Sequence, residues 1–441
     1  MANGSGKRTT SKGPASAALR QRATTSFSRT FASFSNYNYR LYWFGQLISV
    51  IGTWISRVAM AWLVLKLTNS SFDLGLVGTL QFLPLTIFAL VGGVLADRVP
   101  KRRLLVCTQA VLALQSLALA VLITTGVIQI WHIYVLALVQ GLAKAFDNPT
   151  RQAFVSEMVG TENLSNAVAL NSSLFNTARI IGPAIGGFLI AAFSMSVPFY
   201  IDTISFLAVI GGLLAMRPAE FHNVPKPSRG PVLRRMREGI SYAARTPEVA
   251  LVLIVMGFIG TFGYNFTTIL PLVAKFVLGT GALGFGSLLT AMGVGSLLAA
   301  LAMAYINRPT QRLLLVGAVG FTFLLGALAL STMYLLTIGI LVVLGFLSIT
   351  FTSTANSRLQ LNAPGELRGR VMSLYIFFNA GTAPLGTFLL GWLGERYNVQ
   401  LAVGAMDAMC VVGVLLALFY LARLRSRQPV PAREHESAPA D

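Results

Sequence analysis

Long apolar runs alternate with short polar connections along almost the whole chain. A run of about 20 apolar residues spans a bilayer as a helix, because a helix satisfies its own backbone hydrogen bonds in hydrocarbon. The pattern therefore predicts an all-α membrane protein with twelve transmembrane helices in two six-helix pseudo-repeats. The predicted spans are residues 41–67, 73–96, 103–125, 131–148, 165–192, 197–216, 248–274, 282–306, 312–331, 335–357, 369–393 and 399–422.

Basic residues gather on alternate connections, which sets the expected orientation. One side carries 28 lysines and arginines, of which 7 lie in the amino-terminal tail, 17 in the even-numbered connections and 4 in the carboxyl-terminal tail. The other side carries Lys66, Lys275 and Arg396. Because basic connections stay on the cytoplasmic side, both termini are expected in the cytoplasm, with the chain in the cell (inner or plasma) membrane.

Composition excludes several other classes of protein. The chain is 55% hydrophobic and 11% charged, unlike an ordinary soluble domain. Its net charge of +19 lies in tails and loops beside the spans, where topology and attraction to membrane lipid explain it without a nucleic-acid partner. Cys107 and Cys410 show no ligand spacing, and the three histidines are far apart, so no metal or other cofactor is expected.

Polar and basic segments divide the chain into five parts. We expect a disordered basic cytoplasmic tail at 1–40 and a basic cytoplasmic linker at 217–247. Between and after them lie an N-terminal six-helix bundle at 41–216, a C-terminal bundle at 248–422 and a cytoplasmic tail at 423–441. Residues 232–244 could form an amphipathic helix on the cytoplasmic surface. The composition of 1–40 also fits an organelle transit peptide, although it has no apolar core of a secretory signal.

The two halves resemble each other. GGVLADRVPKRRLLV at 92–106 corresponds to ALAMAYINRPTQRLLLV at 300–316, and GPAIGG at 182–187 corresponds to APLGTF at 383–388. Repeats of six helices are typical of transporters in which two bundles rock about a site near the middle of the membrane.

Two motifs carry a resemblance to a known family. Gly93, Asp97, Arg98, Lys101 and Arg102 match the signature that the major facilitator superfamily has between spans two and three, although Pro100 stands where that signature usually has Gly. Gly182, Pro183, Gly186 and Gly187 match the span-five signature of exporters in that superfamily. Over roughly 36–425 the chain therefore resembles this superfamily, and NYRLYWFGQ at 38–46 is similar to its enterobactin-exporter and macrolide-efflux branch.

The motifs predict a gate. A charge bridge at Asp97 would bias one conformational state, because breaking it leaves a partly buried charge unpaired. A simple topology signal is the alternative. The span-five glycines allow close helix approach, for a seal or for ordinary packing, and Pro183 opens the backbone ladder. Asp147 is a further gating residue that could pair with Lys144 or with the basic 97–102 loop.

Polar residues at helical spacing predict a cavity. The resemblance implies that spans one, four, seven and ten line it, and in lipid a polar face must meet protein or water. The candidates are Gln46, Ser49, Thr53, Arg57, Gln140, Lys144, Tyr264, Asn265, Thr352 and Asn356. Hydrogen bonding between helices is the alternative. A lone charge here costs about 3 kcal/mol, so Arg57 is the leading ligand contact, while Arg179 could serve the span-five interface.

Proton coupling requires a carboxylate in a membrane-accessible cavity. The candidates are Asp147, Asp202 and Asp407, with Asp147 favoured because span four should line the cavity. Ala137 stands where the span-four signature of drug–proton antiporters has Arg, which puts a standard relay in doubt.

These observations predict a secondary active transporter that exports a small amphipathic organic compound, a drug or siderophore-like molecule, by alternating access, with proton antiport as one drive. Its partners would be that substrate, protons under antiport and membrane lipid, and a monomer is expected. An importer of a small metabolite, and a receptor or assembly factor on the same fold, are the alternatives. No catalytic constellation and no nucleotide-binding Gly-Lys loop recur, so the chain is not expected to be an enzyme or an ATP-driven pump.

Overall fold

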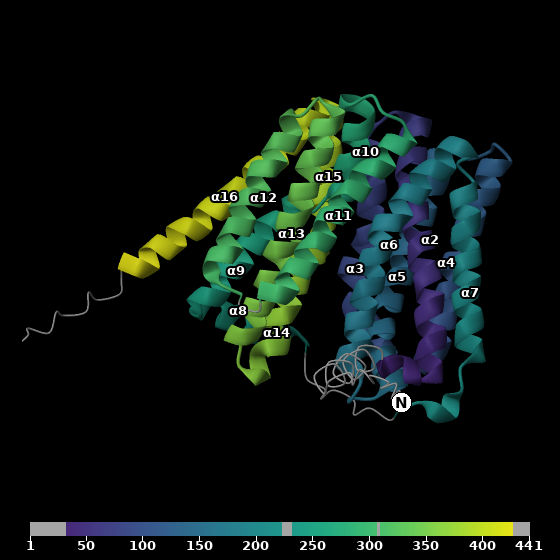
Figure 1. The fold of residues 1–441 in the computed structure, drawn as a ribbon, viewed down its shortest axis with the longest axis horizontal. Coiled ribbons are helices and arrows are strands. Elements are labelled where there is room, and N and C mark those ends of the chain that lie inside the picture. The colour runs from purple at the N-terminus through teal and green to yellow at the C-terminus, as the bar shows by residue number, and fades with distance from the viewer. Residues whose placement is uncertain (1–31, 223–231, 307–308, 427–441) are drawn as a thin grey trace, which may run out of the picture.

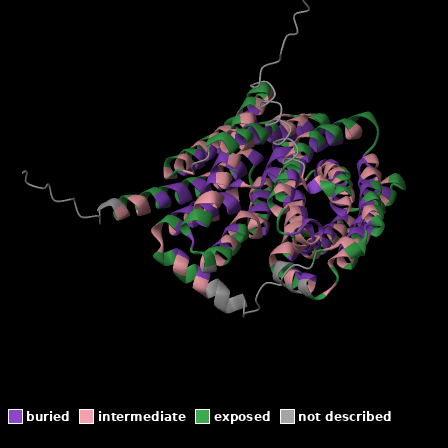
Figure 2. Ribbon diagram, turned by 60° about the horizontal axis from the view of Figure 1, so that its bottom comes forward, coloured by how far each residue is buried: buried purple, intermediate pink, exposed green. Residues whose placement is uncertain are grey.

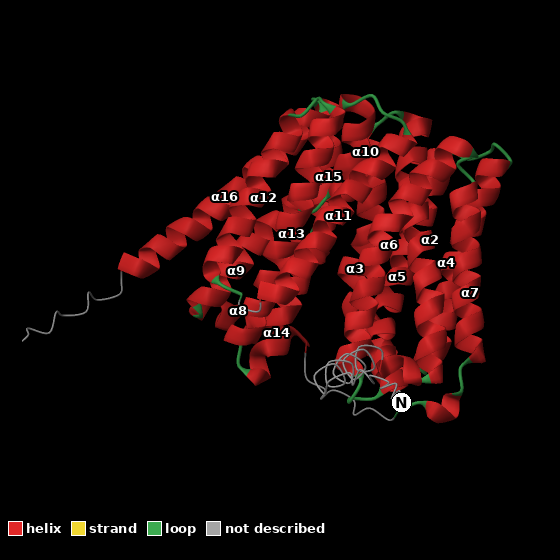
Figure 3. Cartoon of the chain, viewed as in Figure 1, coloured by secondary structure: helices red, strands yellow, loops and turns green. Residues whose placement is uncertain are grey.

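The structure, a computed structural model, describes residues 32–222, 232–306 and 309–426. Within these ranges it contains helices and no strand, as Figure 3 shows, which confirms the all-α prediction. The helices run roughly side by side, as expected for a bundle whose members cross a membrane.

The first half of the chain forms six long helices (Figure 1). After the short turn η1 (Ala32–Ser35) they are α2 (Tyr37–Thr68), α3 (Ser71–Arg98), α4 (Lys101–Thr124), α5 (Ile130–Val159), α6 (Leu164–Ala192) and α7 (Val197–Ala215). The turn η2 (Pro218–Glu220) follows.

The second half begins with α8 (Val232–Arg245), which lies in the linker. The elements after it are α9 (Pro247–Phe258), η3 (Ile259–Gly263), α10 (Phe266–Leu272), η4 (Val273–Val277), α11 (Ala282–Ile306), α12 (Gln311–Leu330), α13 (Tyr334–Asn362), α14 (Gly365–Ile376), η5 (Phe377–Gly381), α15 (Ala383–Arg396) and α16 (Val399–Ser426).

Eleven of the described helical segments are long and apolar enough to cross a membrane, which agrees with the predicted spans except at span four. That span is α5, which has 30 residues and carries Gln140, Lys144 and Asp147. It packs between α3 and α4 and therefore runs with the spanning helices. Large apolar side chains such as Leu114, Phe323 and Leu335 are exposed, and Figure 2 shows exposed residues on the outer faces of the bundle. An exposed apolar surface of this extent fits a lipid environment.

Spans seven and eleven are interrupted, although the sequence analysis predicted continuous helices. Span seven contains the π-helical turns η3 and η4, and span eleven contains η5. The amide of Asn265 donates to the carbonyl oxygens of Thr261 (2.8 Å) and Phe262 (3.2 Å), and so satisfies backbone groups beside the first interruption. An apolar run carries no mark of such a turn, and π turns are frequent at functional sites.

The tails are shorter than predicted. Residues 1–31 and 427–441 lie outside the described residues, but residues 32–40, assigned to the first tail, form η1 and the start of α2. The backbone N–H of Ser33 donates to Asn166 Oδ1 at 3.0 Å, which ties this segment to the start of α6. The other domain limits stay predictions.

The linker helix α8 packs against α9 and α14 of the second half. The hydroxyl of Tyr242 donates to the carbonyl oxygen of Asn362 at 2.8 Å, and Glu238 forms an ion pair with Arg370. The helix expected at 232–244 is therefore present and attached to the second half, while 223–231 lies outside the described residues.

Two crossings join the halves, α3 with α15 and α6 with α11. A Cβ atom at Gly75 would lie 2.7 Å from Gly391 Cα, and one at Gly286 would lie 2.5 Å from the carbonyl oxygen of Pro183. Four residues after each glycine a threonine hydroxyl reaches across. Thr79 donates to Pro384 O (3.2 Å) and Thr290 to Ile180 O (3.3 Å). The same local chemistry recurs in both halves, as a repeat requires.

These crossings leave the molecule closed at the end where α2 passes into α3. Buried apolar residues of both halves form one continuous cluster there, and the rings of Trp62 and Phe285 stack across it. At the opposite end the first half has a separate cluster that includes Tyr39, Phe154 and Met158. The apolar core is thus shared by the halves at one end only.

Candidate substrate cavity and gate

A central cavity of about 400 Å³ lies between the halves. Its lining residues come from α2 and α6 on one side and from α10, α11, α13, α14 and their neighbours on the other. They are Trp54, Arg179, Tyr264, Phe266, Thr267, Leu289, Met292, Ser348, Ile349, Thr352, Tyr375 and Asn379. This set contains one cation and no carboxylate. An apolar, aromatic wall with a few polar groups is typical of a small-molecule site.

The two tyrosines of the cavity are held by the backbone of α13. The hydroxyl of Tyr264 donates to Ser348 O at 3.2 Å, and that of Tyr375 donates to Thr352 O at 3.3 Å. Because their polar ends are engaged with carbonyl groups, their rings form fixed parts of the wall.

A second polar cluster lies inside the first half, around a space of about 10 Å³ that holds roughly one water molecule. It is lined by Thr53, Ser56, Arg57, Met60, Gln81, Gln115, Ser116, Leu119, Gln140, Lys144, Phe199 and Asp202. The guanidinium of Arg57 lies 4.4 Å from the centroid of the Trp54 ring, so Trp54 joins this cluster to the central cavity.

Asp202 is the carboxylate of this cluster, and it is 1% exposed. Its Oδ2 atom accepts a long hydrogen bond from Ser116 Oγ (3.4 Å), and its Oδ1 atom has no partner among the described residues. The sequence analysis favoured Asp147 over Asp202, but α7 brings Asp202 into the same polar cluster as Arg57 and Lys144. The chain distance between these residues hid that proximity.

The structure separates the predicted cavity residues into four groups. Tyr264 and Thr352 line the central cavity, while Thr53, Arg57, Gln140 and Lys144 line the small polar cluster. Gln46 and Ser49 are buried within the first half. Asn265 lies against α15, where a Cβ at Gly386 would meet its amide nitrogen at 2.4 Å, and Asn356 accepts from Gln360 Nε2.

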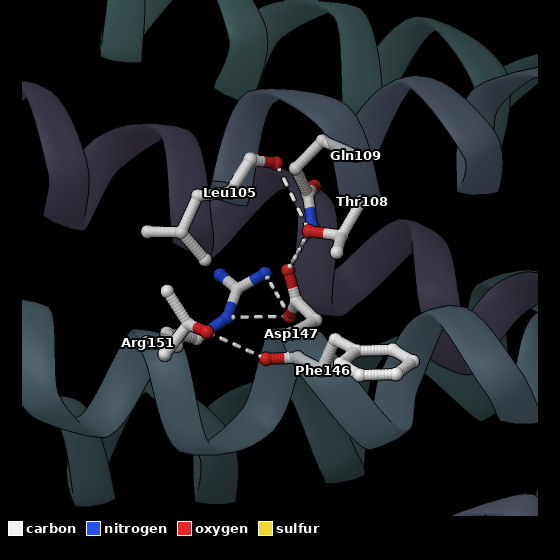
Figure 4. Close-up of polar contacts among 7 residues, drawn as sticks. Leu105, Thr108, Gln109, Phe146, Asp147 and Arg151 are labelled. Carbon is white, nitrogen blue, oxygen red and sulfur yellow. Dashed lines mark hydrogen bonds and ion pairs between the residues drawn. The ribbon is translucent and has the colours of Figure 1, made fainter. Parts of the chain in front are cut away.

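Asp147 is held in a cluster of its own (Figure 4). Its carboxylate pairs with Arg151 at 2.7 Å and accepts from Thr108 Oγ1 (2.8 Å) and Gln109 Nε2 (2.9 Å). The expected pairing with Lys144 is therefore wrong, because Lys144 points into the small polar cluster. The cluster ties α5 to α4 and occupies both oxygens of Asp147.

The basic loop between α3 and α4 has other partners than Asp147. Lys101 forms an ion pair with Glu157 of α5 at 2.5 Å, and Arg102 donates to the carbonyl oxygens of Leu213 and Leu214 at the end of α7. Arg98 is exposed, and the side chain of Asp97 lies outside the described residues. The acidic partner that sequence reasoning missed is Glu157.

In this motif the close helix contact is made by Gly92, which precedes the signature residue Gly93. A Cβ at Gly93 would have no heavy atom within 4 Å, whereas one at Gly92 would lie 2.3 Å from Ala145 O of α5. Glycine at 92 therefore lets α3 and α5 approach each other closely.

The span-five glycines face two helices. A Cβ at Gly182 would lie 2.4 Å from Trp54 Cβ, and one at Gly186 would lie 3.1 Å from Ile55 O, both on α2. Gly187 faces α11 across the halves, since its Cβ would lie 2.8 Å from Ala282 O. The motif therefore supports both the interior of the first half and the crossing to the second.

Two charged residues of the second half hold the ends of α2 and α3. Glu395 accepts from the backbone N–H groups of Ser71 (2.8 Å) and Phe72 (3.3 Å) at the start of α3. Lys275 donates to Leu65 O (2.5 Å) near the end of α2. An anion at a helix start and a cation at a helix end both complement the helix dipole. We call Glu395 and Lys275 the latch pair.

Asp407 lies outside both cavities. Its carboxylate sits against α12, where a Cβ at Gly326 would meet Oδ2 at 2.8 Å, and its Oδ1 atom has no hydrogen-bond partner among the described residues. The cavity residues that the sequence analysis did not name include Trp54, Phe266, Tyr375 and Asn379. Tyr375 and Asn379 lie four residues apart in an apolar span, and this polar spacing is the signal by which the sequence could have identified them as lining residues.

Comparison with known proteins decides the family. A major facilitator family model described as transmembrane secretion effector matches residues 28–440. The chain belongs to this family. Among curated relatives of this major facilitator protein, the staphyloferrin A transporter of Staphylococcus aureus is 24% identical over 82% of this chain and 92% of its own. The enterobactin exporter EntS of Escherichia coli is 25% identical over 89% and 94%.

Solved structures agree on the fold of this major facilitator protein. A bacterial homologue of the human lysosomal transporter Spinster, in an inward-facing and unoccupied conformation, aligns with a TM-score of 0.69 at 12% identity, over 90% of this chain and 99% of that one. The nucleoside transporter NupG aligns with a TM-score of 0.67 at 10% identity, over 87% and 99%. At these identities the likeness concerns the fold alone. Fold and family are those of transporters rather than of enzymes.

Proposed function

We propose that this protein is a secondary transporter that exports a siderophore-like organic compound from the cell by alternating access. The observation that carries the proposal is the central cavity of about 400 Å³. Both halves line this cavity, and the closed end of the molecule lies on one side of it. Two relatives whose names concern siderophores support the substrate class.

We propose further that the closed end is extracellular and that the structure faces inward. The basic connections and α8 lie at the other end, and retention of positive charge assigns that end to the cytoplasm. In this orientation the latch pair and the Gly75 and Gly187 contacts form the outer gate. Opening outward requires these contacts to separate while the halves close around the cytoplasmic end of the cavity.

Cysteine labelling tests this orientation. In a variant without the exposed Cys107, a cysteine at Ser241 of α8 should react with a membrane-impermeant maleimide only after permeabilisation. A cysteine at Asn398, between α15 and α16, should react in intact cells. Labelling of the Ser241 site in intact cells would contradict the orientation.

Transport is tested by accumulation of a siderophore panel in cells with and without the protein. Export predicts lower accumulation in expressing cells, whereas import predicts higher accumulation. Equal accumulation of every compound, with the protein present in the membrane, would overturn the proposal.

Ionophores added to the same cells distinguish the two possible energy sources for export, the pH gradient and the membrane potential. Proton antiport predicts loss of export when nigericin collapses the pH gradient, and Asp202 is the carboxylate best placed to carry the proton because it lines the polar cluster. A charged substrate predicts loss of export when valinomycin collapses the membrane potential, because moving one charge is worth about 2.3 kcal/mol per 100 mV.

A further inference from the structure

The membrane interior of the first half carries an excess of positive charge. Arg57 of α2, Lys144 of α5 and Arg179 of α6 lie in spanning helices, and none of them forms an ion pair with a carboxylate of the described residues. Asp202 is the one carboxylate in the two cavity linings, and Asp147 is engaged by Arg151.

The three cations form one group. Arg57 and Lys144 line the same small polar cluster, in which Asp202 is the one carboxylate, and Arg57 and Arg179 both lie beside Trp54. Arg179 lines the central cavity directly, and Arg57 stacks on Trp54, whose ring lines the same cavity. Charges of one sign gathered away from water destabilise each other, and an anion bound among them removes that repulsion.

The remaining wall suits an aromatic body. Trp54, Tyr264, Phe266 and Tyr375 line the cavity, and both tyrosine hydroxyls are engaged with backbone carbonyl oxygens. The rings therefore offer faces and edges to a planar apolar group, and Arg179 offers a guanidinium that binds carboxylate or phenolate oxygens.

We propose that the cavity binds an organic anion with an aromatic body, with its acidic group held by Arg179 and the positive field of Arg57 and Lys144. This rests on the proposed function, because it names the substrate class of the same site. It also identifies a drive. A proton added to Asp202 would strengthen the positive field and so tighten binding of the anion. In proton antiport the effect is the reverse, because proton and substrate compete for the transporter. The membrane potential acting on the substrate's own charge then drives export.

A pair of dyes with the same ring system and opposite charge tests the proposal. Binding of the anionic dye fluorescein and the cationic dye rhodamine 123 is measured by fluorescence anisotropy on the full chain in lipid nanodiscs. Fluorescein should bind more tightly by roughly tenfold or more, which corresponds to about 1.4 kcal/mol. Arg179→Gln should remove that preference, and Arg179→Lys, which keeps the charge, should retain most of it.

Two further variants sharpen the result. Asp202→Asn should tighten fluorescein binding several-fold, because it removes the one negative charge of the group. Lys66→Gln, which removes an exposed charge at the closed end, should leave both affinities unchanged. Absence of fluorescein binding, equal affinity for the two dyes, or a full preference retained in Arg179→Gln would each overturn the proposal.

The transport assay keeps the two proposals apart. Anion binding without export of any compound would contradict the exporter function and leave the site assignment standing. Export of neutral or cationic compounds with no preference for anions would contradict the site assignment and leave the exporter function standing.

Discussion

Glu395 accepts a hydrogen bond from the backbone N–H of Ser71 at 2.8 Å, although 324 residues separate them in the chain. A side chain of the second half thereby caps the first turn of a helix in the first half. Ser70 already caps the same turn, since its hydroxyl accepts from Asp73 N–H at 3.1 Å. Glu395 is therefore dispensable for forming α3 and adds stability specifically to the state in which this end is closed.

The first prediction concerns that contact. Glu395→Gln removes a charge at a helix start that is worth about 0.3–1 kcal/mol, so the closed state should lose stability and the open population should rise roughly two- to fivefold. Spin labels at Asn69 and Asn398, in exposed loops of the closed end, report the change as a larger share of long distances. Glu162→Gln, an exposed acid outside this end, is the matched control. An unchanged distance distribution in Glu395→Gln would show that the contact does not bias the equilibrium.

The second prediction concerns the α6–α11 crossing. Gly187→Ala places a methyl group 2.8 Å from Ala282 O, and overpacking of this kind costs about 1–3 kcal/mol in the state that contains the contact. The closed end should open more often, and transport should fall by roughly tenfold, since the cycle needs both states. Gly211→Ala is the control, because a Cβ there meets no atom within 4 Å. Equal transport by Gly187→Ala and Gly211→Ala would refute a gating role for this contact.

The third prediction concerns the Asp147 cluster in Figure 4. Asp147→Asn leaves Arg151 without its carboxylate partner in a buried setting, which typically costs about 3–5 kcal/mol. Thermal unfolding in detergent should show a clear loss of stability. The double variant Asp147→Asn with Arg151→Gln should recover part of it, because the unpaired charge is gone. Wild-type stability of Asp147→Asn would mean that the ion pair contributes little.

The fourth prediction concerns the basic loop. Asp97→Asn should depress transport strongly while membrane expression stays near normal, because it removes one charge from the predicted bridge and no core packing. Glu157→Gln breaks the ion pair with Lys101 and should depress transport in the same direction. Initial export rates normalised to the amount of protein in the membrane make the comparison. Full activity of both variants would show that this loop sets topology and does not gate.

Some of the fold could be predicted because membrane insertion depends on local composition. Insertion of each segment depends on its own apolar length and flanking charges, so the predicted spans fall close to the observed helices at most positions. Close helix packing at the motif Gly182–Gly187 could also be predicted, since glycines spaced along one helix face have few roles other than close packing.

The candidate site was harder to predict, because the sequence indicates that polar residues in a span face inward but not which residues they contact. Asn265 was expected in the cavity and instead supports a π turn against α15, while Lys144 lies with Asp202 of α7 and not with Asp147. Periodicity fixes which residues share a face of one helix, but the neighbour that a face meets depends on how helices from distant parts of the chain pack.

The sequence by itself determined that this chain crosses a membrane many times, with basic connections on one side and a repeated half, because hydrophobic length, charge and repetition are local properties. Only the tertiary structure decided that Glu395 reaches the start of α3, that Asp202 joins Arg57 and Lys144, and that the halves meet at one end. Those relationships join residues far apart in the chain, and they arise only when helix packing closes the distance.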